Sequence, residues 1–153
     1  MVKSLIPCTL LLFSMSATAF NLPIQNLFVS MVERSGMPAN EVTIDQALQR
    51  VAIKMNQYLP SEVDKETRLD KMTAETGRQL TYHYTLITMK SNDVNKAKFK
   101  NAMEPVLKRR LCASDEMKTF LRHGVNIVYV YRAADIQPVA SFKYLPADCG
   151  YKK

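Results

Sequence analysis

The stretch RQLTYHYTLIT, residues 78–88, decides the fold class of this 153-residue chain. Apolar and aromatic residues alternate in it with polar ones. Because successive side chains of a β-strand point to opposite faces, the alternation predicts a half-buried strand. Its two faces carry different residues, with Leu80, Tyr82, Tyr84 and Leu86 on the inner face and Thr81, His83 and Thr85 on the outer face.

The segments around this strand predict two hairpins. The turn Glu75-Thr76-Gly77 precedes the strand, so residues 67–73 are expected to form the other arm of a first hairpin. Further along, VNIVYVY (125–131) and VASFKYL (139–145) are two more expected strands. Residues 133–138 join them as the turn of a second hairpin.

Apolar residues at helical spacing predict a helix over residues 43–59, before the first hairpin. Thr43 and Gln46 make a capping box at its start, and Pro60 ends it. A shorter helix is expected after Pro23, a residue well suited to a first helical turn.

Two further helices are expected between the hairpins. Asn92-Asp93 is the predicted cap of a helix that starts near Val94, and Pro105 predicts a kink or a break in it because proline lacks a backbone donor. A second, short helix is capped by Ser114 and ends at Gly124. Helices and strands are therefore grouped rather than alternating singly. This order predicts an α+β single domain with about four antiparallel strands in two hairpins and helices packed on one face.

The N-terminal residues have the features of a secretory signal peptide. Lys3 precedes the apolar run 5–13, and Ala17-Thr18-Ala19 provides the small residues that signal peptidase accepts. We expect residues 1–19 to be removed and residues 20–153 to form the exported domain. The apolar run is shorter than the roughly 20 residues that cross a bilayer, so the protein is expected in the periplasm or the extracellular medium.

Two cysteines remain after the signal peptide, which contains Cys8. In an exported protein, Cys112 and Cys149 predict one structural disulfide. A redox-active pair is the alternative, but it favours the close C-x-x-C spacing that these residues lack. Lipidation at Cys8 is a further alternative, although Leu5-Ile6-Pro7 before it lacks the small residues expected there.

The chain is basic, and its positive charges gather on one expected helix. Without Lys3, 20 basic and 14 acidic residues give a net charge of +6. A stripe on the helix after Val94 is a candidate site for an anionic membrane surface or lipopolysaccharide, and it consists of Lys96, Lys100, Lys108, Arg109 and Arg110. Such a stripe is also typical of the solvated side of an amphipathic helix. A nucleic-acid partner is not expected.

The motifs of common exported enzymes are missing from the sequence. It has no H-E-x-x-H, no G-x-S-x-G and no glycine-rich phosphate loop. Its two histidines, His83 and His123, each have a structural explanation, one on the polar side of a strand and the other at a helix end. We therefore expect no catalytic residue, no metal and no cofactor. A small hydrolase that uses Asp64, Glu66 or Asp70 is the remaining enzymatic alternative.

The charged stretch YLPSEVDKETRLD, residues 58–70, links the expected helix to the first hairpin. Val63 and Leu69 are candidate core contacts in this crossing, and local hydrogen bonds from polar side chains are expected to fix the turn. If the turn lines a cleft, it is the best candidate binding site, and the residues of that site are Asp64, Glu66 and Thr67.

Tyrosines on the expected strands allow two interpretations. An aromatic platform on an exposed sheet binds ligands by stacking, whereas inward-facing tyrosines pack between sheet and helices. The second interpretation is favoured because Tyr82 and Tyr84 alternate with polar residues. The remaining members of the group are Tyr129, Tyr131 and Tyr144.

Four segments together resemble a family of small exported proteobacterial proteins. They are PSEVDKETRL (60–69), LTYHYTL (80–86), Cys112 with HGVNIVYVY (123–131), and PADCG (146–150). The resemblance implies export, a single domain and a bridge between Cys112 and Cys149. It implies no activity, since none is assigned to the family.

A fold pattern without catalytic motifs favours a non-enzymatic binding protein of the cell envelope. Inhibitors, assembly factors and pilotin-like helpers of secretion machines have this size, and the expected partner is another envelope protein. The alternative from a different class is an anion-binding surface protein that acts on lipid or lipopolysaccharide through the basic helix.

Overall fold

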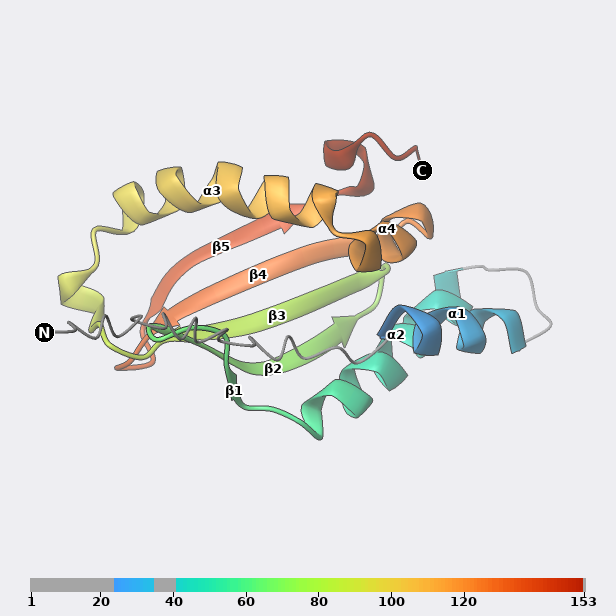
Figure 1. Ribbon diagram of the computed structural model, residues 1–153, viewed down its shortest axis with the longest axis horizontal. Coiled ribbons are helices and arrows are strands. Elements are labelled where there is room, and N and C mark those ends of the chain that lie inside the picture. The colour runs from blue at the N-terminus through green and yellow to red at the C-terminus, as the bar shows by residue number, and fades with distance from the viewer. Residues whose placement is uncertain (1–23, 35–40, 153) are drawn as a thin grey trace, which may run out of the picture.

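The structure is a computed structural model that describes residues 24–34 and 41–152. The predicted signal peptide lies outside the described residues, as do Pro23 and the start of the predicted mature chain. Figure 1 shows the order of the elements. They are α1 (Ile24–Arg34), α2 (Glu41–Asn56), β1 (Ser61–Glu62), β2 (Thr67–Glu75), β3 (Gln79–Leu86), η1 (Ser91–Asp93), α3 (Lys96–Ala113), α4 (Asp115–Arg122), β4 (Asn126–Ala133), β5 (Pro138–Tyr144) and η2 (Pro146–Cys149).

The strands form one mixed sheet in the order β1-β2-β3-β4-β5. Both predicted hairpins, β2–β3 and β4–β5, are present and antiparallel. The prediction of a purely antiparallel sheet is wrong at the centre, where β3 and β4 are parallel. The chain leaves β3, returns to the other end of the sheet through α3 and α4, and therefore enters β4 in the same direction. The two-residue strand β1 is a fifth strand that the sequence pattern did not indicate.

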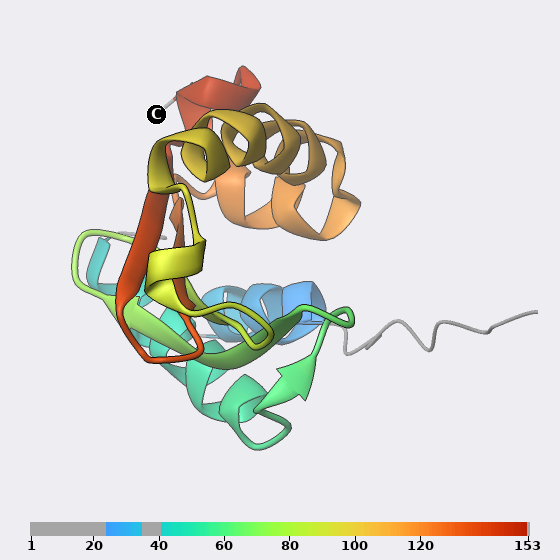
Figure 2. The same ribbon diagram turned by 90° about the vertical axis from the view of Figure 1, so that its left-hand side faces the viewer.

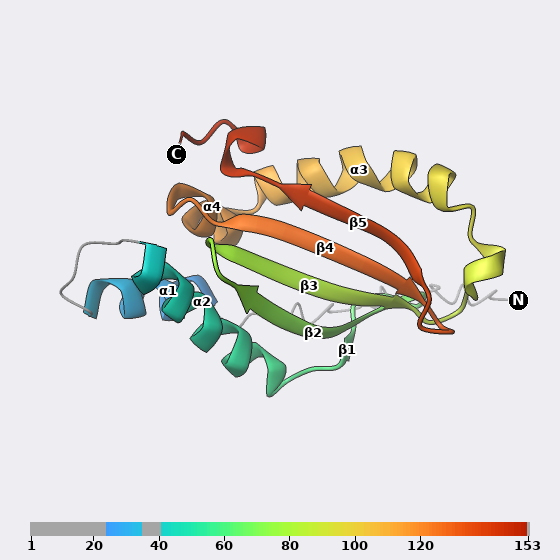
Figure 3. The ribbon, with the colours of Figure 1, turned by 180° about the vertical axis from the view of Figure 1, so that it is seen from behind.

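The helices lie around the margins of a curved sheet. Figure 2 shows α3 above the β5 side and β1 at the opposite margin. Helix α1 packs on both α2 and α4 and closes one end of the domain, where Phe28 and Phe120 meet with ring centroids 4.8 Å apart. Seen from behind, no described helix crosses the middle of the sheet (Figure 3).

The two faces of β3 differ as predicted. Leu80, Tyr82 and Leu86 are buried in the core that the helices cover. On the other face, Thr81 and Thr85 are also buried, because polar neighbours hydrogen-bond their hydroxyls. The alternation thus separates an apolar layer from a hydrogen-bonded polar one, both of which exclude water.

Helix α2 attaches to the edge of β2 through two polar side chains. The amide of Asn56 accepts a hydrogen bond from Met72 N at 2.8 Å and donates one to Met72 O at 2.9 Å. The carboxylate of Asp45 accepts from the backbone N–H groups of Gly77 and Arg78 at the β2–β3 turn. These bonds satisfy Met72 on the edge of β2 beyond the point at which β1 ends, and they hold the following turn.

The predicted ends of α2 need correction. The helix begins at Glu41, two residues before the expected cap at Thr43, and it ends at Asn56, before Pro60. Thr43 lies inside the helix, so Thr43 and Gln46 do not form a capping box at its start.

The predicted cap of α3 is also wrong. Asn92 and Asp93 belong to η1, and the side chain of Asn95 caps the helix by accepting from Lys98 N at 3.0 Å. The helix then runs unbroken through Pro105. For α4, the predictions are confirmed: Ser114 accepts from Met117 N, and Gly124 has φ +76° after its end.

The predicted disulfide is present. It joins Cys112 in the last turn of α3 to Cys149 in η2, with Cα atoms 5.2 Å apart. It fixes the C-terminal end of the chain to α3, as expected from the sequence. Within residues 24–34 and 41–152, no helix is long and apolar enough to span a membrane.

Candidate functional site

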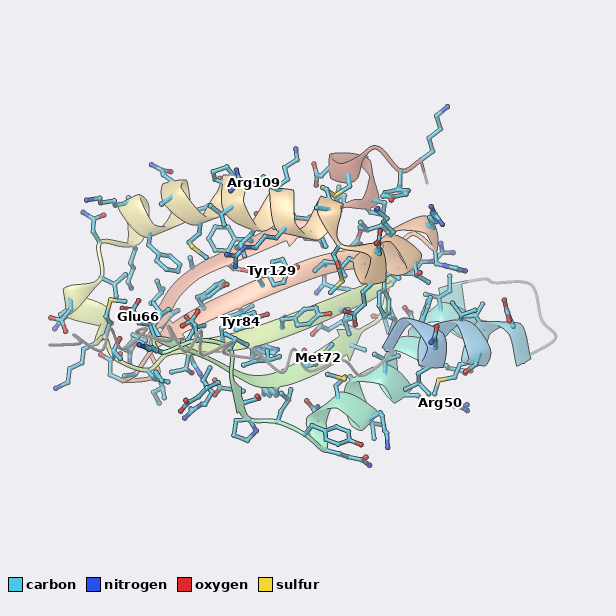
Figure 4. The ribbon with its side chains drawn as sticks, viewed as in Figure 1. Arg50, Glu66, Met72, Tyr84, Arg109 and Tyr129 are labelled. Atoms are coloured by element: carbon cyan, nitrogen blue, oxygen red, sulfur yellow. A yellow bond between two sulfur atoms is a disulfide. The ribbon has the colours of Figure 1, made fainter. Side chains whose placement is uncertain are left out.

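A cleft of about 460 Å³ opens between α3 and the loop that joins β1 to β2. Strands β3 and β4 form its floor, and Figure 4 shows Tyr84 on the sheet beneath α3. The volume falls in the roughly 300–1,000 Å³ range of ligand-binding pockets. The lining residues are Val63, Asp64, Glu66, Thr67, Tyr84, Leu86, Met89, Phe99, Met103, Val106, Leu107, Arg110 and Tyr131.

The floor of the cleft is aromatic. Tyr84 and Tyr131 are paired across the parallel strands β3 and β4, and their rings stack with centroids 5.0 Å apart and planes 16° apart. Phe99 from α3 packs edge-on against Tyr131 at 5.4 Å. Parallel pairing in register therefore places one tyrosine of each strand side by side beneath α3.

The tyrosines of the floor are neutral at physiological pH. Burial raises the pKa of Tyr131 to about 12, and burial raises the pKa of Tyr84 further. Neither hydroxyl is hydrogen-bonded to a protein group in the part of the chain that the structure describes. The cleft therefore offers two uncharged donors within an apolar surface.

Local hydrogen bonds order the loop opposite α3. Thr67 O accepts from Val63 N at 2.9 Å and from Asp64 N at 3.3 Å, and Glu66 O accepts from Ile87 N at 2.8 Å. The carboxylate of Asp64 accepts from Glu66 N at 2.8 Å, which is the local bond that fixes a turn of this kind. Three backbone N–H groups of this wall, those of Val63, Asp64 and Glu66, are therefore occupied.

The three residues proposed from the charged stretch, Asp64, Glu66 and Thr67, all line this cleft. Val63 lines it too and is 54% exposed, so its predicted core role is wrong, since an apolar residue beside a cleft need not face the interior. Leu69 is half-buried and packs against the core, as expected.

The predicted basic stripe is divided by the structure. Arg110 lines the cleft, whereas the four others are exposed on α3 and outside the lining: Lys96, Lys100, Lys108 and Arg109. The stripe therefore does not act as one surface with the cleft.

Of the three carboxylates of the hydrolase alternative, two line the same cleft and Asp70 does not. Asp64 and Glu66 line the cleft, but Asp70 accepts from Thr85 at 2.5 Å, and Thr85 belongs to the opposite face of β3. Burial would raise the pKa of Asp70, but hydrogen bonds from Thr85, Arg68 and Arg132 outweigh it, so the pKa is lowered. A carboxyl that stays ionised in this way is a structural anchor and a poor general acid.

The histidines belong to structural hydrogen bonds. His83 Nε2 lies 2.9 Å from the hydroxyl of Thr73, and His123 Nδ1 lies 2.8 Å from the carbonyl of Thr119. Neither lines the cleft. Among the described residues, no group of three or more His, Cys, Asp or Glu side chains is placed to hold a metal ion.

Sequence reasoning named one wall of the cleft, favoured a core role for the tyrosines of its floor, and named Arg110 of the α3 wall only as part of the basic stripe. The tyrosine-rich strands and the apolar stripe of α3 were visible, yet both are also typical of a buried core. Their role as cleft residues depends on the gap between α3 and the β1–β2 loop, for which the sequence has no local indication.

Three solved structures have a similar fold. One is a Pseudomonas aeruginosa protein that is provisionally described as secreted. It is 18% identical to this chain, with a TM-score of 0.61 over 71% of this chain and 95% of that chain. The type II secretion pilotin EpsS of Vibrio vulnificus is 12% identical, with a TM-score of 0.58 over 73% and 96% of the two chains. The type II secretion pilotin AspS of Vibrio cholerae is 16% identical, with a TM-score of 0.53 over 78% and 99%.

At these identities the likeness establishes the fold alone. No curated protein matches the chain. A family model does match residues 43–139, a range that runs from α2 into β5 and includes every element of the cleft. The chain therefore belongs to the family described as a domain of unknown function, DUF8479.

Proposed function

We propose that this chain is an exported, non-enzymatic interaction protein of the cell envelope whose cleft holds an amphipathic helix of a partner protein. The observation that carries the proposal is the cleft itself, which has an aromatic floor of Tyr84 and Tyr131 and apolar side chains of α3 beside charged ones at its walls. Apolar surface that lies open in a cleft is typical of a binding site.

A helix fits this cleft better than an extended peptide does. Strands β3 and β4 lie inside the sheet and pair on both sides, so the floor offers side chains and no free strand edge. The nearby loop groups are occupied, since Val63 N and Asp64 N bond Thr67 O. An extended peptide would leave its own backbone groups unpaired there, whereas a helix satisfies them internally.

The chemistry of the lining supports binding rather than catalysis. Its side chains include no histidine, cysteine or serine, and its ionisable groups besides the tyrosines are Asp64, Glu66 and Arg110. Met89 and Met103 add flexible apolar contacts that adapt to a partner surface.

The predicted signal peptide supports an envelope location. Two of the structures with a similar fold are pilotins of type II secretion systems, and this likeness supports a helper role beside a secretion machine or another envelope assembly. The helix-in-cleft proposal itself rests on the geometry of this chain.

Site-specific photocrosslinking tests the proposal. A photoreactive residue at Val63 or Met103, in cells that produce the protein with its leader, is expected to crosslink one envelope protein through a defined segment. The matched control is Ile136, which is 71% exposed on the β4–β5 turn and outside the cleft lining.

A peptide of the crosslinked segment is then titrated against the purified domain. Met103→Glu is expected to weaken binding at least about tenfold, because it places an unpaired charge in an apolar site, while Ile53→Glu at a 65% exposed position leaves binding unchanged. Crosslinks of equal yield from Ile136, or equal losses from both substitutions, would refute a role for the cleft.

A second candidate function is binding to an anionic surface through the exposed side of α3. Lys96, Lys100, Lys108 and Arg109 make no ion pair within the described residues. Sedimentation with phosphatidylglycerol vesicles tests it: binding should fall as salt rises and should be lost in K100E/K108E/R109E. Binding that survives this triple substitution excludes it.

A further inference from the structure

The two walls of the cleft, the β1–β2 loop and α3, carry opposite charges. Asp64 and Glu66 lie on the β1–β2 loop, and we call them the acidic lip; Arg110 lies across from them on α3. Lys65 stands between the two carboxylates in sequence but does not line the cleft. None of the three lining charges forms an ion pair within the residues described here.

Charges on both walls of the cleft influence the pKa of one floor residue, Tyr131. After burial, the largest electrostatic influences on the pKa of Tyr131 are Arg110, which lowers it, and Asp64, which raises it. The hydroxyl of Tyr131 thus lies within the field of both charges. A partner held over Tyr131 is subject to the same asymmetric field, which is strongest at low salt.

We infer that the acidic lip and Arg110 fix the direction in which a partner helix lies in the cleft. The inference rests on the proposed function. A helix that places its apolar stripe on the floor has one flank toward the acidic lip and the other toward Arg110. A partner with Lys or Arg on the first flank and Asp or Glu on the second is complementary.

Charge complementarity here selects a direction and not merely a partner. Turning the helix end for end over the floor exchanges its two flanks and brings like charges together. The favoured direction therefore avoids repulsion as well as gaining attraction. Because the charges lie at a solvent-exposed rim, we expect a preference of roughly 3- to 10-fold for one direction over the other.

Three designed peptides of the same length test the inference. Each has a Leu/Ala stripe; the first has Lys on one flank and Glu on the other, the second has these flanks exchanged, and the third has Gln on both. A nitroxide at the peptide N-terminus reports direction by broadening the methyl signals of two methionines. Met89 follows the end of β3 and lines the cleft, whereas Met117 lies in α4, at the end of the sheet where β3 begins (Figure 1).

The first and second peptides are expected to broaden different methionines, and the Gln peptide to broaden both. The charge-exchanged variant D64K/E66K/R110E should reverse the pattern of the first two peptides. Its substitutions are at exposed positions. A variant with the same change in net charge at exposed positions outside the lining, Q49K/Q57K, should leave the pattern unchanged. High salt should erase the preference.

The outcomes separate the two ideas. If the Gln peptide binds and both charged peptides broaden the same methionine, the directional inference is wrong and the helix-binding proposal stands. If none of the three peptides binds, the proposal that the cleft holds a helix is wrong, and the inference falls with it.

Discussion

The phenol of Tyr144 donates a hydrogen bond of 2.8 Å to the backbone carbonyl of Glu104. This bond ties the last residue of β5 to the middle of α3, the helix that forms one wall of the cleft. Further along α3, Leu107 and Leu111 are buried, and Cys112 bonds Cys149. The wall is therefore anchored in its C-terminal half. In its first turns, before Met103, Phe99 is the only half-buried residue and the others are exposed.

Tyr144→Phe is expected to lower the free energy of unfolding by about 1 kcal/mol, the typical net contribution of one hydrogen bond. Urea denaturation measures the change. Tyr84→Phe is the matched control, because the Tyr84 hydroxyl has no hydrogen-bond partner in the described part of the protein, and its effect on unfolding should be close to zero. Equal losses from both substitutions would contradict a stabilising role for the Tyr144 bond.

Removal of the disulfide by C112A/C149A is expected to cost about 4 kcal/mol, because the bridge closes a loop that spans 37 positions and restricts the unfolded chain. Chemical denaturation of residues 20–153 with and without reductant measures this. Reductant should destabilise the wild type to a similar extent and leave the double variant unaffected. A wild-type chain that is indifferent to reductant would show that the bridge contributes little.

The strands were predicted well from the sequence because alternation and turn residues are features of short segments. Alternation in β3 and the two turns were enough to place β2–β5 within a few residues. The direction of β4 relative to β3 was missed because parallel and antiparallel strands share one periodicity. The helices between them were the available indication, since parallel neighbours need a crossover of a dozen or more residues.

The cleft was predicted only where its residues are neighbours in sequence. Asp64, Glu66 and Thr67 stood out as a charged turn, and they do line the cleft. The floor depends on the register that sets Tyr84 beside Tyr131, 47 positions apart, and this register is fixed by packing across the whole sheet. A cleft made from distant segments is therefore not indicated by local sequence patterns.

Asn56→Ala is expected to destabilise the domain by about 1–3 kcal/mol, because it leaves the N–H and C=O of Met72 without their partner at the edge of β2. Equilibrium unfolding gives the change in free energy. Amide hydrogen exchange at Met72 should accelerate by more than the change in global stability accounts for. Gln57→Ala, at the neighbouring exposed position, is the control and should have little effect. Unchanged hydrogen-exchange protection of the Met72 amide would argue against a stabilising role for the Asn56 hydrogen bonds.

Asp70 should make stability depend on pH in the acid range. Burial opposes ionisation, but bonds from Thr85, Arg68 and Arg132 lower the pKa of Asp70 in the folded state below its unfolded value. The unfolded chain therefore takes up the proton first as pH falls. The stabilisation is complete above the unfolded pKa of about 3.9 and is lost as pH drops through the lower, folded pKa.

Asp70→Asn should accordingly be less stable than the wild type at pH 6, and the two proteins should converge toward pH 2. Urea midpoints measured at intervals over this range give both curves. Asp115→Asn is the matched control: its ion pair with Lys118 is on the surface, with the Asp115 side chain 91% exposed, so its curve should stay close to that of the wild type. An Asp70→Asn curve that runs parallel to the wild type down to pH 2 would mean that the fold does not depend on the ionised carboxylate.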